Sequence, residues 1–292
     1  MEKIKVAIIG TGNIGTDLLM KIQRSLYLEC SLFTGRNFLS PGMLKASALG
    51  IKISDRGIHA IIEDPSICDI VFDATSALNH FEHAPILKKL NKFVIDMTPA
   101  KIGILCIPAV NLDEAIKSDN VNMITCGGQA SIPLAYAISK AQPNLEYVET
   151  ISTIASRSAG PGTRINIDEY ISATEKGLKD FTKIKETKAM INLNPGNPAV
   201  DMQTTVIVEV ENPNLEQIKF EINKIVTLIQ QYVPGYEVIV EPTYDNGVLL
   251  TTVKVIGLGD YLPKFAGNLD IINCAAIAVA EKYAKNKLGV KS

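Results

Sequence analysis

Residues 4–15 constrain the fold more than any other part of the chain. The run from Ile4 to Ile9 is almost continuously apolar, as a buried parallel strand is. Gly10-Thr-Gly-Asn-Ile-Gly15 follows it, and apolar residues then recur at helical spacing as far as Leu26. A strand, a glycine-rich turn and a helix in this order are typical of a dinucleotide-binding βαβ unit.

The three glycines of this turn have different tasks. Gly10 permits the tight turn, Gly12 lets a pyrophosphate approach the backbone, and Gly15 allows the helix to pack closely on the strand. The pyrophosphate would lie at the helix N-terminus. We therefore expect cofactor contacts from the whole turn, which comprises Gly10, Thr11, Gly12, Asn13, Ile14 and Gly15. A plain strand–helix turn that needs small residues is the alternative.

The end of the second expected strand bears on the choice between NAD and NADP. An NAD site commonly carries an acidic residue about 20 residues after the glycines, where it binds the ribose hydroxyls. Here the segment Phe33-Thr-Gly-Arg-Asn37 contains no acid. Arg36 is placed to pair with a 2′-phosphate, so NADP is an alternative to NAD. Arg36 as a solvated residue stacked on adenine is the other interpretation.

Composition excludes several classes of function. The 292 residues carry a net charge of −2 and no basic run, which disfavours a nucleic-acid partner. No apolar run is long enough for a membrane span, and the first residues lack the apolar stretch of a signal peptide, so we expect neither. The five cysteines are scattered and lack Cys-x-x-Cys spacing, so we expect no disulfide framework, no metal site and a cytoplasmic location.

Alternating elements predict a Rossmann-type, doubly wound parallel sheet, followed by an α+β substrate and dimerisation domain. We place the dinucleotide-binding domain at residues 1–130 and the catalytic domain at 131–267, with a C-terminal helix at 268–292 that packs back on the first domain. Further strands are expected at 27–33, 69–74, 93–97, 104–110, 121–124, 147–156, 204–210, 237–240 and 249–257. Further helices are expected at 43–49, 81–90, 134–141, 168–184, 215–232 and 269–287.

Cys126 has the sequence context of a nucleophile. The stretch Asn122-Met-Ile-Thr-Cys-Gly-Gly-Gln-Ala130 places the thiol between an apolar strand pattern and a helical one. A thiol in the first turn of a helix is favoured as thiolate by backbone N–H groups and by the helix dipole. The other four cysteines lie in apolar contexts typical of buried residues.

A second notable segment is the loop Ser156-Arg-Ser-Ala-Gly-Pro-Gly-Thr-Arg-Ile-Asn-Ile-Asp168. Two glycines and a proline make a rigid turn, and Asp168 can cap the helix that follows. Such a loop suits the binding of nicotinamide or of an acyl substrate. A purely structural connection between a strand and a helix is the alternative.

These motifs together resemble those of the acylating acetaldehyde dehydrogenases, whose fold is similar to that of glyceraldehyde-3-phosphate dehydrogenase. The resemblance runs through residues 8–18, 72–77, 96–100, 108–112, 125–130, 158–164 and 267–271. It implies a reaction in which acetaldehyde or propanal, NAD and coenzyme A give acyl-CoA through a thioester on Cys126. It also implies cofactor contacts from Ser158, Ala159, Gly160, Pro161, Gly162, Thr163, Arg164, Ile165, Asn166 and Asn268, and an orienting role for Asn166 on the acyl oxygen.

The resemblance also implies a partner, a 4-hydroxy-2-oxoacid aldolase that supplies the aldehyde, and a place in the breakdown of aromatic compounds. The C-terminal helix and the β-type runs suit a homodimer equally well. Two alternatives stay open. One is a phosphorylating semialdehyde dehydrogenase, in which phosphate attacks the thioester, and the other is a non-catalytic dinucleotide-binding relative.

The chain departs from the family pattern at the expected base. The family usually has an aspartate in a Met-Arg-Asp-Thr run, and Thr204 stands at that position here. Asp201 is our candidate for the base, on the condition that the strand register shifts to bring it to the site. No histidine follows His83, so a histidine base from the second domain is excluded.

Overall fold

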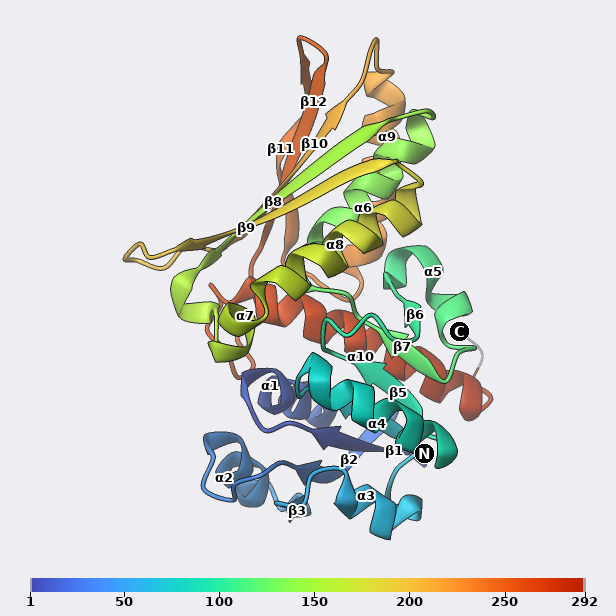
Figure 1. Cartoon of the computed structure of the whole chain (residues 1–292), viewed down its shortest axis with the longest axis vertical. Coiled ribbons are helices and arrows are strands. Elements are labelled where there is room, and N and C mark those ends of the chain that lie inside the picture. The colour runs from blue at the N-terminus through green and yellow to red at the C-terminus, as the bar shows by residue number, and fades with distance from the viewer. Residues whose placement is uncertain (1, 291–292) are drawn as a thin grey trace. The chain divides into compact units, whose positions relative to one another are not determined.

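The computed structural model describes residues 2–290 and divides the chain into two compact units (Figure 1). The first unit runs to Met123 and includes Asp260–Leu262 and the chain from Asn273 onward. The second comprises Ile124–Gly259 and Pro263–Ile272. The boundary expected at 130/131 therefore falls inside a helix that belongs to the second unit.

The first unit is built on a parallel sheet with the strand order β3-β2-β1-β4-β5-β7-β6. The order reverses between β1 and β4, which is the switch point where doubly wound sheets bind ligands. The strands are β1 Ile4–Ile9, β2 Leu28–Thr34, β3 Ile53–Ser54, β4 Ile70–Asp73, β5 Phe93–Asp96, β6 Ile104–Leu105 and β7 Asn120–Asn122. The helices are α1 Asn13–Gln23, α2 Pro41–Ala48, α3 His59–Glu63, η1 Pro65–Ile67, α4 Ala77–Lys89 and α5 Pro108–Ala115.

Two predicted elements of this unit need correction. The strand expected at 104–110 ends at Leu105, because Pro108 begins α5 at a position where its missing N–H costs nothing. The helix expected from Phe81 begins earlier, at Ala77, where the Ser76 side chain accepts a hydrogen bond from the N–H of Asn79.

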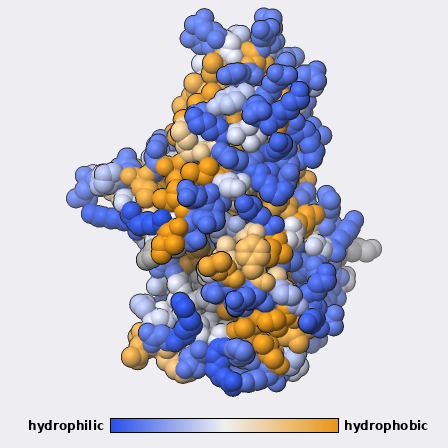
Figure 2. Space-filling view, in the orientation of Figure 1, coloured by the Kyte–Doolittle hydropathy of each residue, from blue (hydrophilic) through white to orange (hydrophobic). Residues whose placement is uncertain are grey.

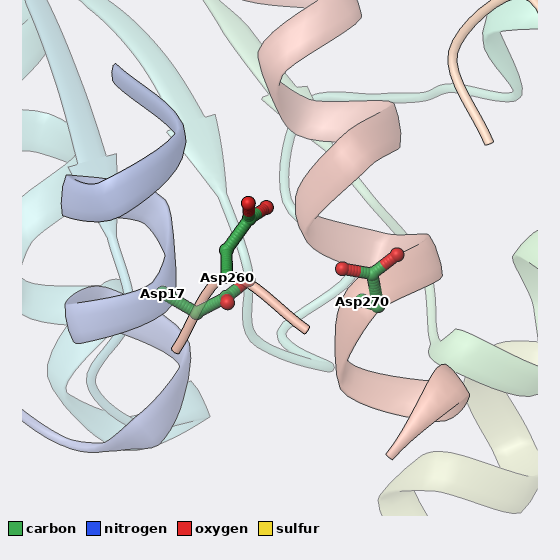
Figure 3. A group of neighbouring side chains, drawn as sticks. All are labelled: Asp17, Asp260 and Asp270. Carbon is green, nitrogen blue, oxygen red and sulfur yellow. The ribbon is translucent and has the colours of Figure 1, made fainter. Parts of the chain in front are cut away.

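Buried charges join α1 to later segments of the same unit. Figure 3 shows Asp17 on α1 and Asp260 on the short segment Asp260–Leu262, which belongs to the first unit. The ammonium of the buried Lys21 lies 2.8 Å from Asp17 and 2.9 Å from Asp260, so its one positive charge is shared between two carboxylates. The amide of Asn273 donates to Asp17 at 2.8 Å. The third aspartate in Figure 3, Asp270, belongs to the second unit.

The second unit combines a mixed sheet of strand order β11-β12-β10-β8-β9 with helices against one face (Figure 1). Its strands are β8 Tyr147–Ala155, β9 Glu186–Asn194, β10 Met202–Glu209, β11 Tyr236–Asp245 and β12 Val248–Val255. Its helices are α6 Cys126–Ala141, η2 Ser156–Ser158, α7 Pro161–Ile165, α8 Ile167–Thr182 and α9 Leu215–Gln230. The last helix, α10 Gly267–Lys287, begins in this unit and continues in the first.

Strand β9, which pairs in parallel with β8, is not among the strands expected from the sequence. Its lysine, asparagine and glutamate residues hide the apolar pattern, because β9 is an edge strand with little buried surface. The predicted fold class, a doubly wound parallel sheet with an α+β partner, is confirmed.

The surface is mostly hydrophilic on the face drawn in Figure 2, with smaller hydrophobic groups between the polar residues. Scattered exposed apolar residues are normal for a folded domain. Among residues 2–290, no helix is both long and apolar enough to cross a membrane.

Candidate active site

A cavity of about 1010 Å³ opens at the switch point of the parallel sheet. Four of the predicted cofactor residues line it: Gly10, Thr11, Gly12 and Arg36. It lies at the carboxyl ends of β1, β2 and β4, where dinucleotides bind in this fold. Asn13 and Ile14 form the first turn of α1, next to this lining.

The glycines of the turn fit a dinucleotide. Gly10 has a φ of +113°, and a Cβ there would lie 2.4 Å from the carbonyl oxygen of Ala74. Gly15 is packed so tightly that a Cβ would lie 1.9 Å from the carbonyl oxygen of Gly10. At Gly12, by contrast, a Cβ would meet no atom within 4 Å. This space at the N-terminus of α1 leaves the backbone open to a pyrophosphate.

A cluster of buried polar residues, which the sequence analysis did not identify, lies beside this cavity. Asp73 ends β4 and accepts hydrogen bonds from Nδ1 of His80 and Nδ1 of His83, each at 2.8 Å, and from Thr75 at 2.5 Å. Although burial alone would raise the pKa of Asp73, these hydrogen bonds hold it below its usual value. Burial raises the pKa of Asp96, at the end of β5, to about 6. In the sequence, an aspartate ends each of two consecutive strands, and this pattern could have identified the cluster.

Cys126 is the first residue of α6, as the sequence predicts. The Thr125 side chain caps the helix by accepting a hydrogen bond from the N–H of Gly128 at 2.8 Å. The Thr125 hydroxyl also lies 2.7 Å from that of Thr174 on α8. Ile124, directly before the cap, has a φ of +63°, a strained value for a β-branched residue. The thiol therefore lies at a strained turn, which the hydrogen bonds of the Thr125 side chain keep in place.

The thiol is not the preformed thiolate that the helix terminus predicts. Burial raises the pKa of Cys126 to about 11, while hydrogen bonds from Tyr170 and from the N–H of Gly127 act in the opposite direction. The sulfur lies 3.8 Å from the hydroxyl oxygen of Tyr170, on α8. The thiol is therefore protonated at neutral pH in this state, because desolvation outweighs the favourable helix terminus.

Thr204 is the third residue of β10, and its hydroxyl oxygen lies 3.0 Å from that of Ser152 on β8. The strand pairs with β8 and β12 without a register shift, so Thr204 stays opposite Ser152. Asp201 precedes β10 and has the opposite parity to the buried residues of that strand. The register shift on which the role of Asp201 depended is absent.

The loop after β8 is closed by its own hydrogen bonds. The Arg164 guanidinium donates to the carbonyl oxygens of Ser156 and Ala159 and to the Ser156 hydroxyl. The Ser158 hydroxyl donates to the carbonyl oxygen of Ala155 at 2.8 Å. The charged end of Arg164 therefore supports the loop itself. The other predicted loop residues in this segment are Gly160, Pro161, Gly162, Thr163 and Ile165, and the surroundings of Pro161 and Gly162 lie outside the described part of the structure.

Asn166 and Asn268 differ in their surroundings. Asn166 is a partly exposed residue between α7 and α8. Asn268 lies in the first turn of α10, 1% exposed, and its Oδ1 has no hydrogen-bond partner among the described residues. A buried amide oxygen without a protein donor suits a ligand N–H such as a carboxamide.

Comparison with known proteins first defines the class of protein to which the fold belongs. Residues 5–118 match the NAD-binding domain of semialdehyde dehydrogenases. A structure of aspartate semialdehyde dehydrogenase with NADP from Candida albicans covers 99% of this chain and 100% of its own at a TM-score of 0.67 and 11% identity. Aspartate semialdehyde dehydrogenase II from Vibrio cholerae gives a TM-score of 0.60 at 15% identity, over 98% of this chain and 99% of its own. The chain has the fold of the nicotinamide-dependent semialdehyde dehydrogenases.

The comparisons of the second unit and of the full-length chain identify the family more specifically. Residues 126–263 match the dimerisation domain of prokaryotic acetaldehyde dehydrogenase. An acetaldehyde dehydrogenase from Pectobacterium atrosepticum is 57% identical over 99% of this chain and 98% of its own length. One from Geobacillus stearothermophilus is 46% identical over the whole of both chains. The chain belongs to the acetaldehyde dehydrogenase family.

Proposed function

We propose that this chain oxidises a short aldehyde, acetaldehyde or propanal, and transfers the acyl group to coenzyme A through a thioester on Cys126. The observation that carries the proposal is the thiol at the capped first turn of α6, in a chain that is similar to acetaldehyde dehydrogenases over its full length. NAD is the proposed cofactor, held by the glycine turn at residues 10–15, the loop at 158–166 and Asn268.

The residues of the second unit account for the chemistry of addition and transfer. Cys126 loses its proton to solvent, and the sulfur forms a bond to the aldehyde carbon. The oxyanion that develops is held by backbone N–H groups at the start of α6 and by the side-chain amide of Asn166. The nicotinamide, when bound, supplies the hydride acceptor. Loss of that hydride from the carbon joined to the Cys126 sulfur would give the thioester. The sulfur of coenzyme A then bonds to the acyl carbon, the bond from that carbon to the Cys126 sulfur breaks, and Cys126 takes up the proton that coenzyme A loses.

The reaction is tested by following reduction of NAD and of NADP with acetaldehyde, with and without coenzyme A. Reduction that requires coenzyme A, with acetyl-CoA as the product, supports the proposal. Reduction that requires phosphate instead assigns the chain to the phosphorylating reaction. Binding of NAD without reduction under any condition makes it a non-catalytic relative.

Arg36 is expected to govern the use of NADP and not that of NAD. It is exposed at the rim of the cavity, and a guanidinium pairs well with a 2′-phosphate. We expect Arg36→Ala to raise the KM for NADP about tenfold, since a hydrogen bond to a charged group is lost, and to change the KM for NAD less than about threefold. Equal losses with both cofactors would instead mean that Arg36 stacks on the adenine.

Asp201 is expected to tolerate replacement, because it lies outside β10 and on the parity that faces away from Thr204. We expect kcat/KM of Asp201→Asn to stay within about twofold of the original protein, where loss of a general base costs about 100-fold or more. Steady-state rates from pH 6 to 9 check this. A loss of that larger size, with the fold intact by circular dichroism, would restore Asp201 as the base.

We further propose that the chain forms a homodimer through its second unit, which matches a dimerisation domain. A 4-hydroxy-2-oxoacid aldolase as source of the aldehyde, a cytoplasmic location and a role in the breakdown of aromatic compounds are parts of the same proposal. Size-exclusion chromatography with light scattering checks the dimer.

A further inference from the structure

We propose that the Tyr170 hydroxyl donates the hydrogen bond that stabilises the Cys126 thiolate, and that Ser152 and Thr204 hold this hydroxyl in place. The inference deepens the proposed function, because it assigns the group that replaces the missing family aspartate at the nucleophile. All four side chains belong to the second unit.

The four polar atoms form a chain across two helices and two strands. The Cys126 sulfur, on α6, lies 3.8 Å from the Tyr170 hydroxyl, on α8. Ser152 on β8 hydrogen-bonds to the Tyr170 hydroxyl, and its own oxygen lies 3.0 Å from that of Thr204 on β10. Tyr170 is 7% exposed and Thr204 is fully buried. The chain therefore begins at the nucleophile and ends at the position where the family has its acid.

Gly127 shows that the structure is built around this hydroxyl. A Cβ at Gly127 would lie 2.0 Å from the Tyr170 hydroxyl oxygen and 2.8 Å from that of Ser152. Only a glycine next to the nucleophile leaves room for the two hydroxyl groups. The backbone of Gly127 also lowers the pKa of Tyr170, against the effect of burial.

The hydrogen bonds to the sulfur identify the donor. The pKa of Cys126 is lowered by hydrogen bonds from the backbone and from one side chain, that of Tyr170. Burial raises the pKa of Tyr170 itself well above 10. Tyr170 thus keeps its proton at neutral pH and acts as a donor. When the S–H bond breaks, the proton passes to water and the electron pair stays on sulfur. The Tyr170 oxygen accepts a hydrogen bond from the thiol beforehand. Once the thiolate has formed, the hydroxyl turns so that its O–H donates to the sulfur.

The thiol pKa of Cys126 tests the inference without any turnover. We would measure the rate of alkylation by iodoacetamide from pH 6 to 10.5, and read it at Cys126 by peptide mass spectrometry. Because this range lies below the pKa of about 11, the rate at each pH is proportional to the thiolate fraction and so reports a shift of that pKa. The proteins compared are the original chain, Tyr170→Phe and the control Tyr236→Phe. Tyr236 is matched because it is also buried and its hydroxyl donates to a carbonyl of α6, that of Ala130, at 2.7 Å.

We expect Tyr170→Phe to raise the kinetic pKa of Cys126 by about one unit or more, since a hydrogen bond to a charged group is lost. Alkylation below the pKa should then slow about tenfold. Tyr236→Phe should leave the profile unchanged. An unchanged pKa in a folded Tyr170→Phe protein overturns the inference, and an equal shift in both variants assigns the effect to loss of packing.

Thr204 provides a second, milder test of the same chain. Thr204→Val keeps the shape but removes the hydroxyl that holds Ser152, so we expect a smaller rise in the kinetic pKa of Cys126, and Thr204→Ser should restore the original value. No shift in Thr204→Val would remove Thr204 from the positioning chain. These outcomes are separate from the proposed function, which fails instead if aldehyde oxidation persists without Cys126.

Discussion

Replacing Cys126 with serine is expected to lower the rate of coenzyme A-dependent aldehyde oxidation by at least about 10⁴-fold, the scale seen when a nucleophile is removed. A serine hydroxyl at the start of α6 lacks the acidity and the nucleophilicity of a thiol. The cavity that we assign to the dinucleotide lies in the first unit, so binding of NAD should be retained. Stopped-flow reduction of NAD, with fluorescence titration of the cofactor, measures both quantities.

Cys274→Ala is the matched control for this replacement. Cys274 is a buried cysteine on α10 that makes no part of the proposed chemistry. We expect it to retain most of the activity, apart from a modest loss of stability. Coenzyme A-dependent turnover in Cys126→Ser at a rate close to that of the original protein would exclude the thioester mechanism altogether.

Gly15→Ala is expected to destabilise the protein by about 2–3 kcal/mol, the cost of overpacking a well-packed contact. The added Cβ would lie 1.9 Å from the carbonyl oxygen of Gly10, which is backbone and cannot rotate away. Helix α1 would have to move off β1, and the displaced turn should bind NAD at least about tenfold more weakly. Urea denaturation followed by circular dichroism, together with NAD titration, checks the two effects.

Gly12→Ala is the control that separates an effect on stability from an effect on cofactor binding. Because a Cβ at Gly12 meets nothing within 4 Å, we expect its stability to change by less than about 1 kcal/mol. The methyl group projects into the space where the pyrophosphate approaches, so NAD binding should still weaken. A Gly15→Ala protein as stable as Gly12→Ala would mean that the contact between α1 and β1 yields easily.

The sequence predicted those helices and strands that have a strong local pattern of apolar residues and glycines. The apolar run at Ile4–Ile9 and the glycine turn gave β1 and α1, because both depend on neighbours in sequence. The Thr-Cys-Gly-Gly context correctly placed Cys126 at a helix start. The polar strand β9 was missed because its stability comes from pairing with β8, which no local pattern reports.

The sequence by itself determined the family, the glycine turn of the cavity and the position of the thiol on α6. Only the tertiary structure decided the surroundings of that thiol. Tyr170, Ser152 and Thr204 are far apart in the chain and meet through the pairing of β8 with β10 and the packing of α6 and α8. The same holds for Asp73 and Asp96, which end neighbouring strands. Burial and hydrogen bonding set pKa values, and both arise only where separate segments come together.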